Sequence, residues 1–378
     1  MIFEASLHAS HKRMRVTLLL LKLRRDLLSL LVAAAAVAFA GAPPEIARAQ
    51  VPSSAPTVIS QGSSKSTSQV APSSTAKKAT EWLERIAKSA RELSYTGVFV
   101  HQTSDGSNTS RITHMLDRQG NEHEKIETLD GPLREVVRRN EEMFCYQPDE
   151  KTVRVDRRAT GRFFPSLITG NPAALADSYN VRLGPTERIA GHDCQWIILE
   201  PRDAMRYKQK LCAELSTGLL VRARMYNERN QLLEQFMFTQ LDVTGTPSKL
   251  SLRSQFEDKG WQRDYAIKNN LKATDTGWQV GNLPAGFRKI TEMVRSLSGR
   301  KESQKESISQ LVYSDGLLHV SVFVVPNAGA SVQPINRRAD GSPINMAVRP
   351  VNDYQVTVMG EVPMAAVQAI ADSVSKRK

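Results

Sequence analysis

Residues 95–116 read YTGVFVHQTSDGSNTSRITHML, and this stretch decides the fold. Aromatic and β-branched residues fill both of its ends, and Asp105-Gly106 lies between them, which is the pattern of a β-hairpin. Similar segments follow without a helix between them and predict strands over residues 122–129, 134–139, 143–147 and 152–156. Strands this closely spaced must pair antiparallel, so the sequence predicts a meander.

Residues 163–180 interrupt this pattern. They contain Pro165, Gly170 and Pro172, and they predict a loop with a short helix over 173–179. Strands then resume over residues 188–189, 194–199, 207–214, 219–226 and 232–241. A helix is expected over residues 80–93, because apolar residues recur there at helical spacing. About ten strands would form one curved sheet, with the helix and the 163–180 segment covering its inner face.

The rest of the chain predicts a second, smaller α+β domain over residues 261–378, after a linker at 246–260. Its strands are expected over residues 262–269, 278–280, 307–313, 317–325 and 353–359, and its helix over 363–374. Residues 327–352 are rich in Asn, Pro, Gly and Arg and are expected to form a loop. The expected fold class is mainly β with α, and the first domain spans residues 79–245.

The first 49 residues have the pattern of a secretory signal peptide. Basic residues between Lys12 and Arg25 precede an apolar run over 27–40, and Ala47-Arg48-Ala49 follows as a cleavage site. A short membrane anchor is the alternative. Residues 50–78 predict a disordered tether, because they bury too little apolar surface to offset the entropy of ordering. A secreted chain would lie in an oxidising compartment, where disulfides form.

The composition limits the class of protein. With 40% hydrophobic and 24% charged residues, the chain can build cores, which excludes wholesale disorder. Only 3 cysteines exclude a small disulfide scaffold and a multi-cysteine metal centre. The formal net charge is +12, but the basic residues are scattered rather than clustered with aromatic residues. No nucleic-acid partner is expected.

The sequence also lacks the motifs of common exported enzymes. It contains no G-x-S-x-G, no H-E-x-x-H and no phosphate-binding Walker loop. His101 and His114 could be neighbours on adjacent strands, but no third residue is spaced to complete a zinc site. Glu122 and Glu124 are interpreted as surface charge rather than as a glycosidase pair. We therefore expect a protein without enzymatic activity, cofactor or metal.

Cys194 and Cys212 lie in two expected strands joined by a short turn. If that hairpin is centred on Asp203, residues whose numbers sum to 406 face each other, and these two cysteines are such a pair. Directly opposed residues have Cα atoms about 4.5–5.5 Å apart, a separation that a disulfide tolerates. Three unpaired buried cysteines are the alternative. Cys145 has no partner in the first case.

Apolar side chains of the expected sheet are candidates for a ligand cavity, although one sequence does not fix their register. They are Val98, Val100, Ile112, Leu129, Val136, Phe144, Val153, Ile197, Leu199 and Leu220. If they share a concave face, acyl chains could occupy it.

An ordered set of segments carries a resemblance to a known family. The segments are residues 81–83, 93–100, 129–136, 144–149, 187–191, 199–203, 206–207 and 217–220, with looser matches near Trp278 and at residues 283–287. The signature residues within them are Arg188, Gly191, Pro201, Arg202, Asp203, Arg206 and Tyr207. Together they resemble the MucB/RseB family of periplasmic sigma-E regulators. The chain departs from the family pattern at Cys212, where a Trp is common.

The resemblance implies a fold and a function. The fold would be an N-terminal half-barrel similar to LolA and LolB, plus the smaller C-terminal domain. In the periplasm, both domains would bind the periplasmic segment of a membrane anti-sigma factor and shield it from proteolysis, which keeps the envelope-stress sigma factor silent. Lipid or lipopolysaccharide in the half-barrel would release this shield. A periplasmic lipid or lipoprotein carrier is the alternative, and self-association is left open.

Overall fold

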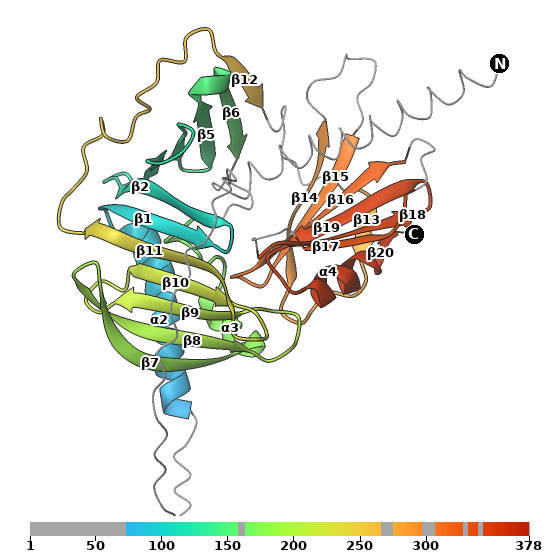
Figure 1. Cartoon of the computed structure of the whole chain (residues 1–378), viewed down its shortest axis with the longest axis horizontal. Coiled ribbons are helices and arrows are strands. Elements are labelled where there is room, and N and C mark those ends of the chain that lie inside the picture. Colours follow the sequence, from blue (N-terminus) through green and yellow to red (C-terminus); the bar gives the residue numbers. More distant parts are fainter. Residues whose placement is uncertain are drawn as a thin grey trace, which may run out of the picture.

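The computed structural model describes residues 73–157, 163–265, 275–296, 307–327, 332–338 and 343–377. These residues form a 12-stranded sheet, a six-stranded sheet and a two-stranded ribbon (Figure 1). The predicted signal peptide and residues 50–72 of the predicted tether lie outside the described residues. Among the helices that are described, none combines the length and the apolar character needed to cross a membrane.

The first sheet is a curved, open layer in which strands follow one another as hairpins. Its strands are β1 (Tyr95–Thr103), β2 (Gly106–Leu116), β3 (Glu122–Thr128), β4 (Glu135–Arg139), β5 (Glu142–Gln147), β6 (Thr152–Arg157), β7 (Tyr179–Ile189), β8 (His192–Pro201), β9 (Lys208–Glu214), β10 (Leu220–Tyr226), β11 (Leu232–Asp242) and β12 (Gln262–Tyr265). Their order is β12-β6-β5-β4-β3-β2-β1-β11-β10-β9-β8-β7. The two runs of strands predicted from the sequence therefore join where β1 pairs with β11.

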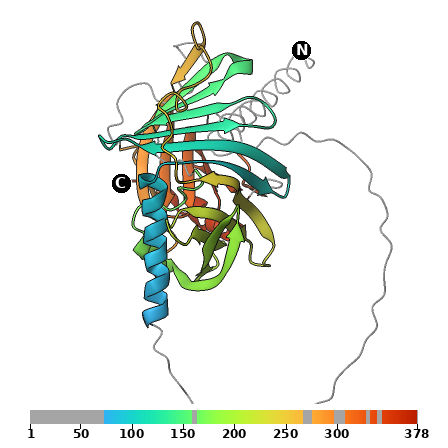
Figure 2. The same ribbon diagram turned by 90° about the vertical axis from the view of Figure 1, so that its left-hand side faces the viewer.

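The helix α2 (Ser73–Glu92) runs across one face of this sheet (Figure 1, Figure 2). It begins seven residues before the predicted start, so residues 73–78 belong to a helix and not to a disordered tether. The reason is local, because Ala76, Lys77, Lys78 and Ala79 are all good helix formers. Leu83 and Ile86 are fully buried against the strands, and this face of the helix is the apolar face that the spacing predicts.

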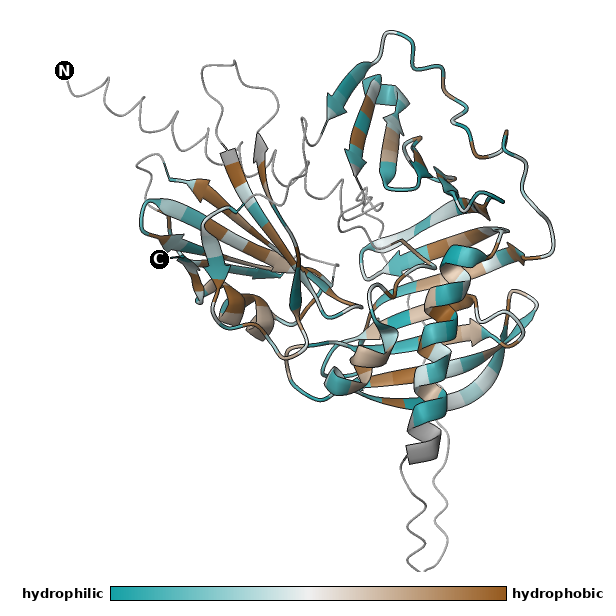
Figure 3. Cartoon of the chain, turned by 180° about the vertical axis from the view of Figure 1, so that it is seen from behind, coloured by the Kyte–Doolittle hydropathy of each residue, from teal (hydrophilic) through white to brown (hydrophobic). Residues whose placement is uncertain are grey.

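Strand pairing assigns every side chain of the sheet to one of two faces, because directly opposed residues point the same way. We call the face that carries α2 the inner face; Tyr95, Phe99 and Ile112 lie on it. The opposite one is the outer face, and Figure 1 turns it toward the viewer over β7–β11, with α2 behind. Figure 3 shows the side of the sheet that α2 crosses, with hydrophobic residues in the strands behind the helix.

Two short elements complete the inner layer. They are the 3-10 turn η2 (Pro172–Ala174) and the helix α3 (Leu175–Ser178), which agree with the loop and short helix predicted over this segment. A further 3-10 turn, η1 (Pro148–Glu150), connects β5 to β6. Strand β7 is much longer than the predicted residues 188–189, because its alternation is hidden by exposed polar residues and by Gly184-Pro185, which an edge strand tolerates.

The second domain is the six-stranded sheet with a helix on one face. Its strands are β14 (Arg288–Ser296), β15 (Ser307–Ser314), β16 (His319–Pro326), β17 (Ile335–Arg338), β18 (Asn345–Val351) and β19 (Tyr354–Gly360), in the order β14-β15-β16-β19-β18-β17. The helix α4 (Met364–Ala371) packs on β18 and β19. The ribbon consists of β13 (Trp278–Val280) and β20 (Val374–Lys376).

Two predictions for this part of the chain are wrong, and one strand was missed. The expected loop at 327–352 contains β17 and β18, whose pairing compensates for their Asn, Pro and Arg content. Strand β14 was not predicted. Residues Gln262–Tyr265, assigned to the second domain, form β12 and pair in parallel with β6 of the first sheet. All three differences arise because strands form here by pairing with distant segments, and a local sequence pattern does not reveal such partners.

A disulfide joins Cys194 and Cys212 on the outer face, with Cα atoms 5.5 Å apart. The predicted register is wrong, because the centre of the hairpin lies one residue further along the chain than Asp203. Cys212 faces Trp196, and Cys194 faces Glu214. Paired residues therefore sum to 408, and the hairpin is centred on Ala204. The cysteines bond as diagonal neighbours, since a shift of two residues keeps both side chains on the same face. Cys145 is a buried free cysteine, and burial raises the pKa of its thiol.

Candidate binding site

The structure divides the ten predicted cavity residues between the two faces. Ile112, Val136, Ile197, Leu199 and Leu220 belong to the inner face or pack against its core. Val98, Val100, Phe144 and Val153 point to the outer face, because they alternate with or oppose inner residues in the observed register. Leu129 follows the end of β3 and is 44% exposed. Only the first group can line an inner site.

The inner face is filled by the chain itself. Residues 163–169, which we call the plug, lie against it beside α2, and Phe164, Leu167 and Ile168 are buried there. The Phe164 ring stacks on Phe236 with centroids 5.5 Å apart and tilts against Phe238 at 4.9 Å. The apolar surface predicted to hold a ligand is therefore occupied by side chains of the plug.

The end of the plug is bonded to the second domain. The backbone N–H of Thr169 donates to the carbonyl oxygen of Gly316 at 2.7 Å, and the Thr169 hydroxyl lies 3.3 Å from the same oxygen. Leu317, the next residue of the β15–β16 turn, is 1% exposed and belongs to the core of the first domain. The plug thus contacts both the inner face and the second domain.

A buried ion pair lies beside this contact. Arg206, two residues before β9, donates from Nε to Asp315 Oδ2 at 2.9 Å, and both side chains are fully buried. The same guanidinium donates to Asp203 and to the carbonyl oxygen of Ala285, while the Tyr179 hydroxyl lies 3.4 Å from Asp315 Oδ2. Burial, followed by the charge of Asp315, raises the pKa of Tyr179 well above its usual range. One buried cation therefore holds groups of both domains.

A second buried link lies next to the first. Asn345 of β18 donates from Nδ2 to the Tyr207 hydroxyl at 2.8 Å, and Tyr207 packs into the core of the second domain. We call Tyr179, Arg206, Tyr207, Asp315 and Asn345 the domain junction. Removing either partner of such a pair would leave an unsatisfied buried group, which is costly. The junction therefore fixes how the two domains meet.

The signature residues fall into two places. Asp203, Arg206 and Tyr207 are at the junction, and Arg202 lies beside it, where its backbone N–H donates to the carbonyl oxygen of Ser178. Pro201 ends β8 opposite Tyr179. Arg188 and Gly191 lie at the β7–β8 turn, where Arg188 is exposed and Gly191 has a φ of 85°. The first place holds the domains together, and the second shapes a turn.

A charged cluster forms the other polar feature of the inner face. Arg138 is almost completely buried and bonds Glu122 and Glu124, and His114 lies between Glu122 Oε1 and the carbonyl oxygen of Leu93. Burial disfavours the charged form of Glu122, but hydrogen bonds from Arg138 and His114 outweigh it and hold the pKa of this carboxyl well below its usual range. Glu124 is only 3% exposed, so its interpretation as surface charge is wrong.

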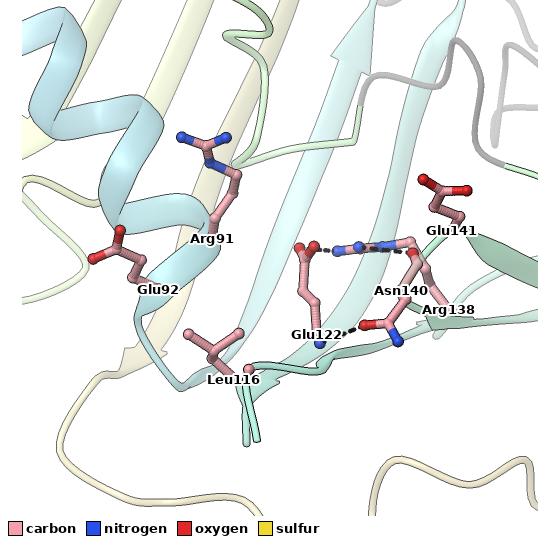
Figure 4. A pocket seen from close by; sticks show the side chains of 8 residues that line it. Arg91, Glu92, Leu116, Glu122, Arg138, Asn140 and Glu141 are labelled. Atoms are coloured by element: carbon pink, nitrogen blue, oxygen red, sulfur yellow. Dashed lines mark hydrogen bonds and ion pairs between the residues drawn. The ribbon is translucent and has the colours of Figure 1, made fainter. Parts of the chain in front are cut away.

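A polar cavity of about 550 Å³ opens at this cluster (Figure 4). It is lined by Arg91, Glu92, Leu116, Gly120, Glu122, Arg138, Asn140 and Glu141. Figure 4 shows the Arg138 guanidinium turned toward Glu122, so the charge of Arg138 is already neutralised. Leu116 is the one large apolar side chain of the lining, which is too little to hold an acyl chain. Arg91 is a second cation of the lining, and its Nε donates to the carbonyl oxygen of Ala87.

The described residues contain no group of three side chains that could hold a metal ion. His101 and His114 are not neighbours, because His101 pairs with Asn108 across the hairpin while His114 pairs with Tyr95. His101 instead bonds Glu234 at 2.8 Å and stacks on Phe236. The structure brings the two histidines into separate networks.

Two family models match the chain, each over one of its two domains. The model of the MucB/RseB N-terminal domain matches residues 78–256, and that of the MucB/RseB C-terminal domain matches residues 272–375. The chain belongs to the MucB/RseB family.

Characterised MucB/RseB proteins are similar along most of the chain. The sigma factor AlgU regulatory protein MucB of Pseudomonas aeruginosa is 31% identical over 306 residues, which cover 80% of this chain and 92% of that protein. The sigma-E factor regulatory protein RseB of Haemophilus influenzae is 25% identical over 303 residues, or 78% and 90% of the two chains. Both relatives bear the names of sigma factor regulators.

Solved MucB structures agree in fold. The crystal structure of MucB in complex with MucA(peri) matches with a TM-score of 0.62 and 28% identity, covering 79% of this chain and 99% of that one. The structure of the Pseudomonas aeruginosa MucA/MucB complex matches with a TM-score of 0.63 and 27% identity, covering 80% and 99%. The matched regions therefore include both domains of this chain, and the MucB chains that they match were solved as complexes with MucA.

Sequence reasoning missed the parts of this MucB/RseB chain that come from distant segments. The 163–180 segment was predicted to cover the inner face, as the plug does. Asp315 and Asn345 were not singled out, although the Asp315-Gly316 turn was recognised as a hairpin. Phe163-Phe164-Pro165 next to strand-poor sequence is the one local signal, since two aromatic residues in a loop need a surface to cover. The partners of Asp315 and Asn345 are more than 100 positions away, and no local pattern points to them.

Proposed function

We propose that this protein acts in the periplasm as a negative regulator of an envelope-stress sigma factor, without enzymatic activity. It binds the periplasmic segment of a membrane anti-sigma factor and shields that segment from regulated proteolysis. The observation that carries the proposal is the match to MucB chains solved with MucA, which extends over both domains of this chain. The buried domain junction supports it, because a partner that contacts both domains needs them in a defined arrangement.

The test is a binding and protection assay with the full chain. Purified protein should bind the periplasmic segment of the cognate anti-sigma factor in calorimetry, and it should slow cleavage of that segment by the site-one protease. A protein that is a lipid or lipoprotein carrier alone would leave both the heat of mixing and the cleavage rate unchanged. That result would reject the proposal in favour of the carrier.

A second function, lipid sensing, is favoured by the plug. Its aromatic and aliphatic side chains cover the apolar inner face as a ligand would, and an acyl chain could take their place. Displacement of the plug would also break the bond between Thr169 and Gly316, which links it to the second domain. Lipid occupancy and the domain contact would then oppose each other, as two-state linkage requires.

Gly316 offers a direct test of this second function. It has a φ of 98°, and a Cβ at this position would come within 2.9 Å of the Thr169 carbonyl oxygen. Gly316→Ala should loosen the plug and therefore increase the affinity for a fluorescent fatty acid several-fold. Gly260→Ala is the matched control, because Gly260 has a φ of 81° and nothing lies within 4 Å of the added Cβ. Equal affinities in the two variants would argue against plug displacement.

A further inference from the structure

Three cations lie together on the outer face of β9 and β10. Arg222 and Arg224 alternate along β10, so both point outward, and Lys210 is directly opposite Arg224 on β9. We call Lys210, Arg222 and Arg224 the cation patch. Figure 1 shows this face turned away from α2, and the second domain meets the sheet at the domain junction instead. The patch therefore does not belong to either site described above.

The structure holds these side chains in place with neutral groups. Gln235 on β11 accepts from Arg222 Nε at 3.0 Å and from Arg224 Nε at 2.7 Å through the same oxygen. The Arg224 guanidinium lies over the Trp196 ring, 5.6 Å from its centroid, and the Lys210 ammonium lies 5.1 Å from that of Tyr226. The shared amide oxygen positions both guanidinium groups and carries no charge that would neutralise them.

The charge of the patch exceeds that of its surroundings. Glu187 is the carboxylate that touches it; this residue bonds Arg222 at 3.2 Å and also accepts from Trp196 Nε1 at 2.7 Å. Within the described part of the chain, Lys210 and Arg224 have no carboxylate partner. Burial and then the charge of Arg224 lower the pKa of Arg222. Like charges placed directly across a strand pair destabilise a sheet, so the arrangement has a cost without an anionic ligand.

We propose that the cation patch is a docking surface for an extended, acidic stretch of the anti-sigma factor's periplasmic segment, an assignment that rests on the proposed function. Arg222 and Arg224 are two residues apart on an extended strand, or about 6.7 Å. Carboxylates at alternate positions of an extended peptide have the same spacing, and each guanidinium can bind one.

The recessed position of the patch favours a peptide over a membrane surface. Only 14% of the Arg222 side chain is exposed, and it lies between Glu187 and Gln235. A single carboxylate on a peptide side chain can reach into such a place, whereas the phosphates of a flat bilayer stay in one plane. Arg guanidinium groups that are ordered by hydrogen bonds also lose little entropy when they bind a planar carboxylate.

The experiment compares two changes of charge on neighbouring positions of β9 and β10. The double variant Lys210→Gln with Arg224→Gln removes the unpaired cations. Lys208→Gln is the matched control, because Lys208 lies on the same face of β9 but already bonds Glu200 at 2.9 Å. Affinity for the purified periplasmic segment of the anti-sigma factor is measured at low and at high salt.

We expect the double variant to weaken binding about tenfold at low salt, and the difference should disappear at high salt. Lys208→Gln should change affinity less than about twofold. Unchanged affinity in the double variant, or an equal loss in the control, would overturn the proposal. If wild-type protein does not bind the segment at all, the proposed function fails, whatever the patch does.

Two further probes separate the patch from its occupant. A synthetic peptide of alternating Glu and Ser should compete with the anti-sigma segment on wild-type protein and bind the double variant more weakly. Vesicles of phosphatidylglycerol should not distinguish the two proteins. If the vesicles lose binding with the double variant while the peptide does not, the surface binds lipid headgroups and the peptide assignment is wrong.

Discussion

Arg206 shows how much of the arrangement rests on one side chain. It is fully buried and bonds Asp203 and Ala285 as well as Asp315, so it satisfies groups on both sides of the domain junction. Breaking a buried pair leaves a charge without compensation, which costs far more than losing a surface pair. The resemblance singled out Arg206 as a signature residue, but its partner Asp315 is visible only in the folded chain.

Asp315→Asn should therefore reduce the free energy of unfolding by about 3 kcal/mol, because Arg206 would remain buried without its counter-charge. Asp258→Asn is the control, since Asp258 and Arg263 form an exposed pair whose loss should cost less than about 1 kcal/mol. Urea denaturation of both variants measures the difference. Coincident curves for the two variants would contradict the role given to the buried pair.

Glu122 should make the stability of the fold depend on pH. The pKa of this carboxyl in the folded protein lies below its ordinary value of 4.5, since Arg138 and His114 outweigh the effect of burial. Its charge therefore stabilises the fold fully above pH 4.5, and this contribution is lost as the pH falls toward the lower, folded-state pKa. Glu122→Gln should be less stable than wild type at neutral pH, and the two should converge on acidification in denaturation curves. A constant difference at all pH values would exclude this cause.

At the scale of elements, the disulfide joins β8 and β9 near the edge of the first sheet. The two cysteines are 18 positions apart, and a closed loop of this size stabilises a fold by about 3 kcal/mol, mainly through the unfolded chain. A variant with Cys194→Ala and Cys212→Ala should unfold at correspondingly lower urea concentration. Mass spectrometry of non-reduced peptides should find the bond in wild-type protein, and free thiols at both positions would refute it.

The helices and strands differ in how well the sequence predicts them, and each difference has a physical reason. Strands β1 to β6 were predictable, because Asp105-Gly106 and similar turns mark their ends. Only half of the predicted cavity residues lie on the inner face. Val98 and Ile112 are both apolar strand residues in the sequence, but the observed register places their side chains on opposite faces. The cover formed by residues 163–180 and a strand near residue 262 were predicted, but the side-chain contacts of the plug and the pairing of β12 with β6 were not, because distant strands supply these partners.

For the whole molecule, the domain junction implies that the two domains unfold together. The core of each domain includes residues from the other domain's sequence: Leu317 in the first, and Tyr207 and Met225 in the second. Wild-type protein should give one transition in scanning calorimetry, and Asp315→Asn should split it into two. Two transitions already in wild type would show that the junction does not couple the domains.

The same variant should weaken binding of the anti-sigma segment, because the domains lose their fixed arrangement.

The parallel pair of β12 and β6 has a consequence for the order in which the chain is completed. Thr152 pairs with Gln262, so the strand that covers the free edge of β6 is synthesised 110 positions after β6 itself. Until then its backbone N–H and C=O groups form an open edge, to which another nascent chain can add. A fragment that stops at residue 245 keeps that edge open for as long as it exists. Work with an isolated first domain should therefore extend the chain through Tyr265, and shorter fragments should aggregate.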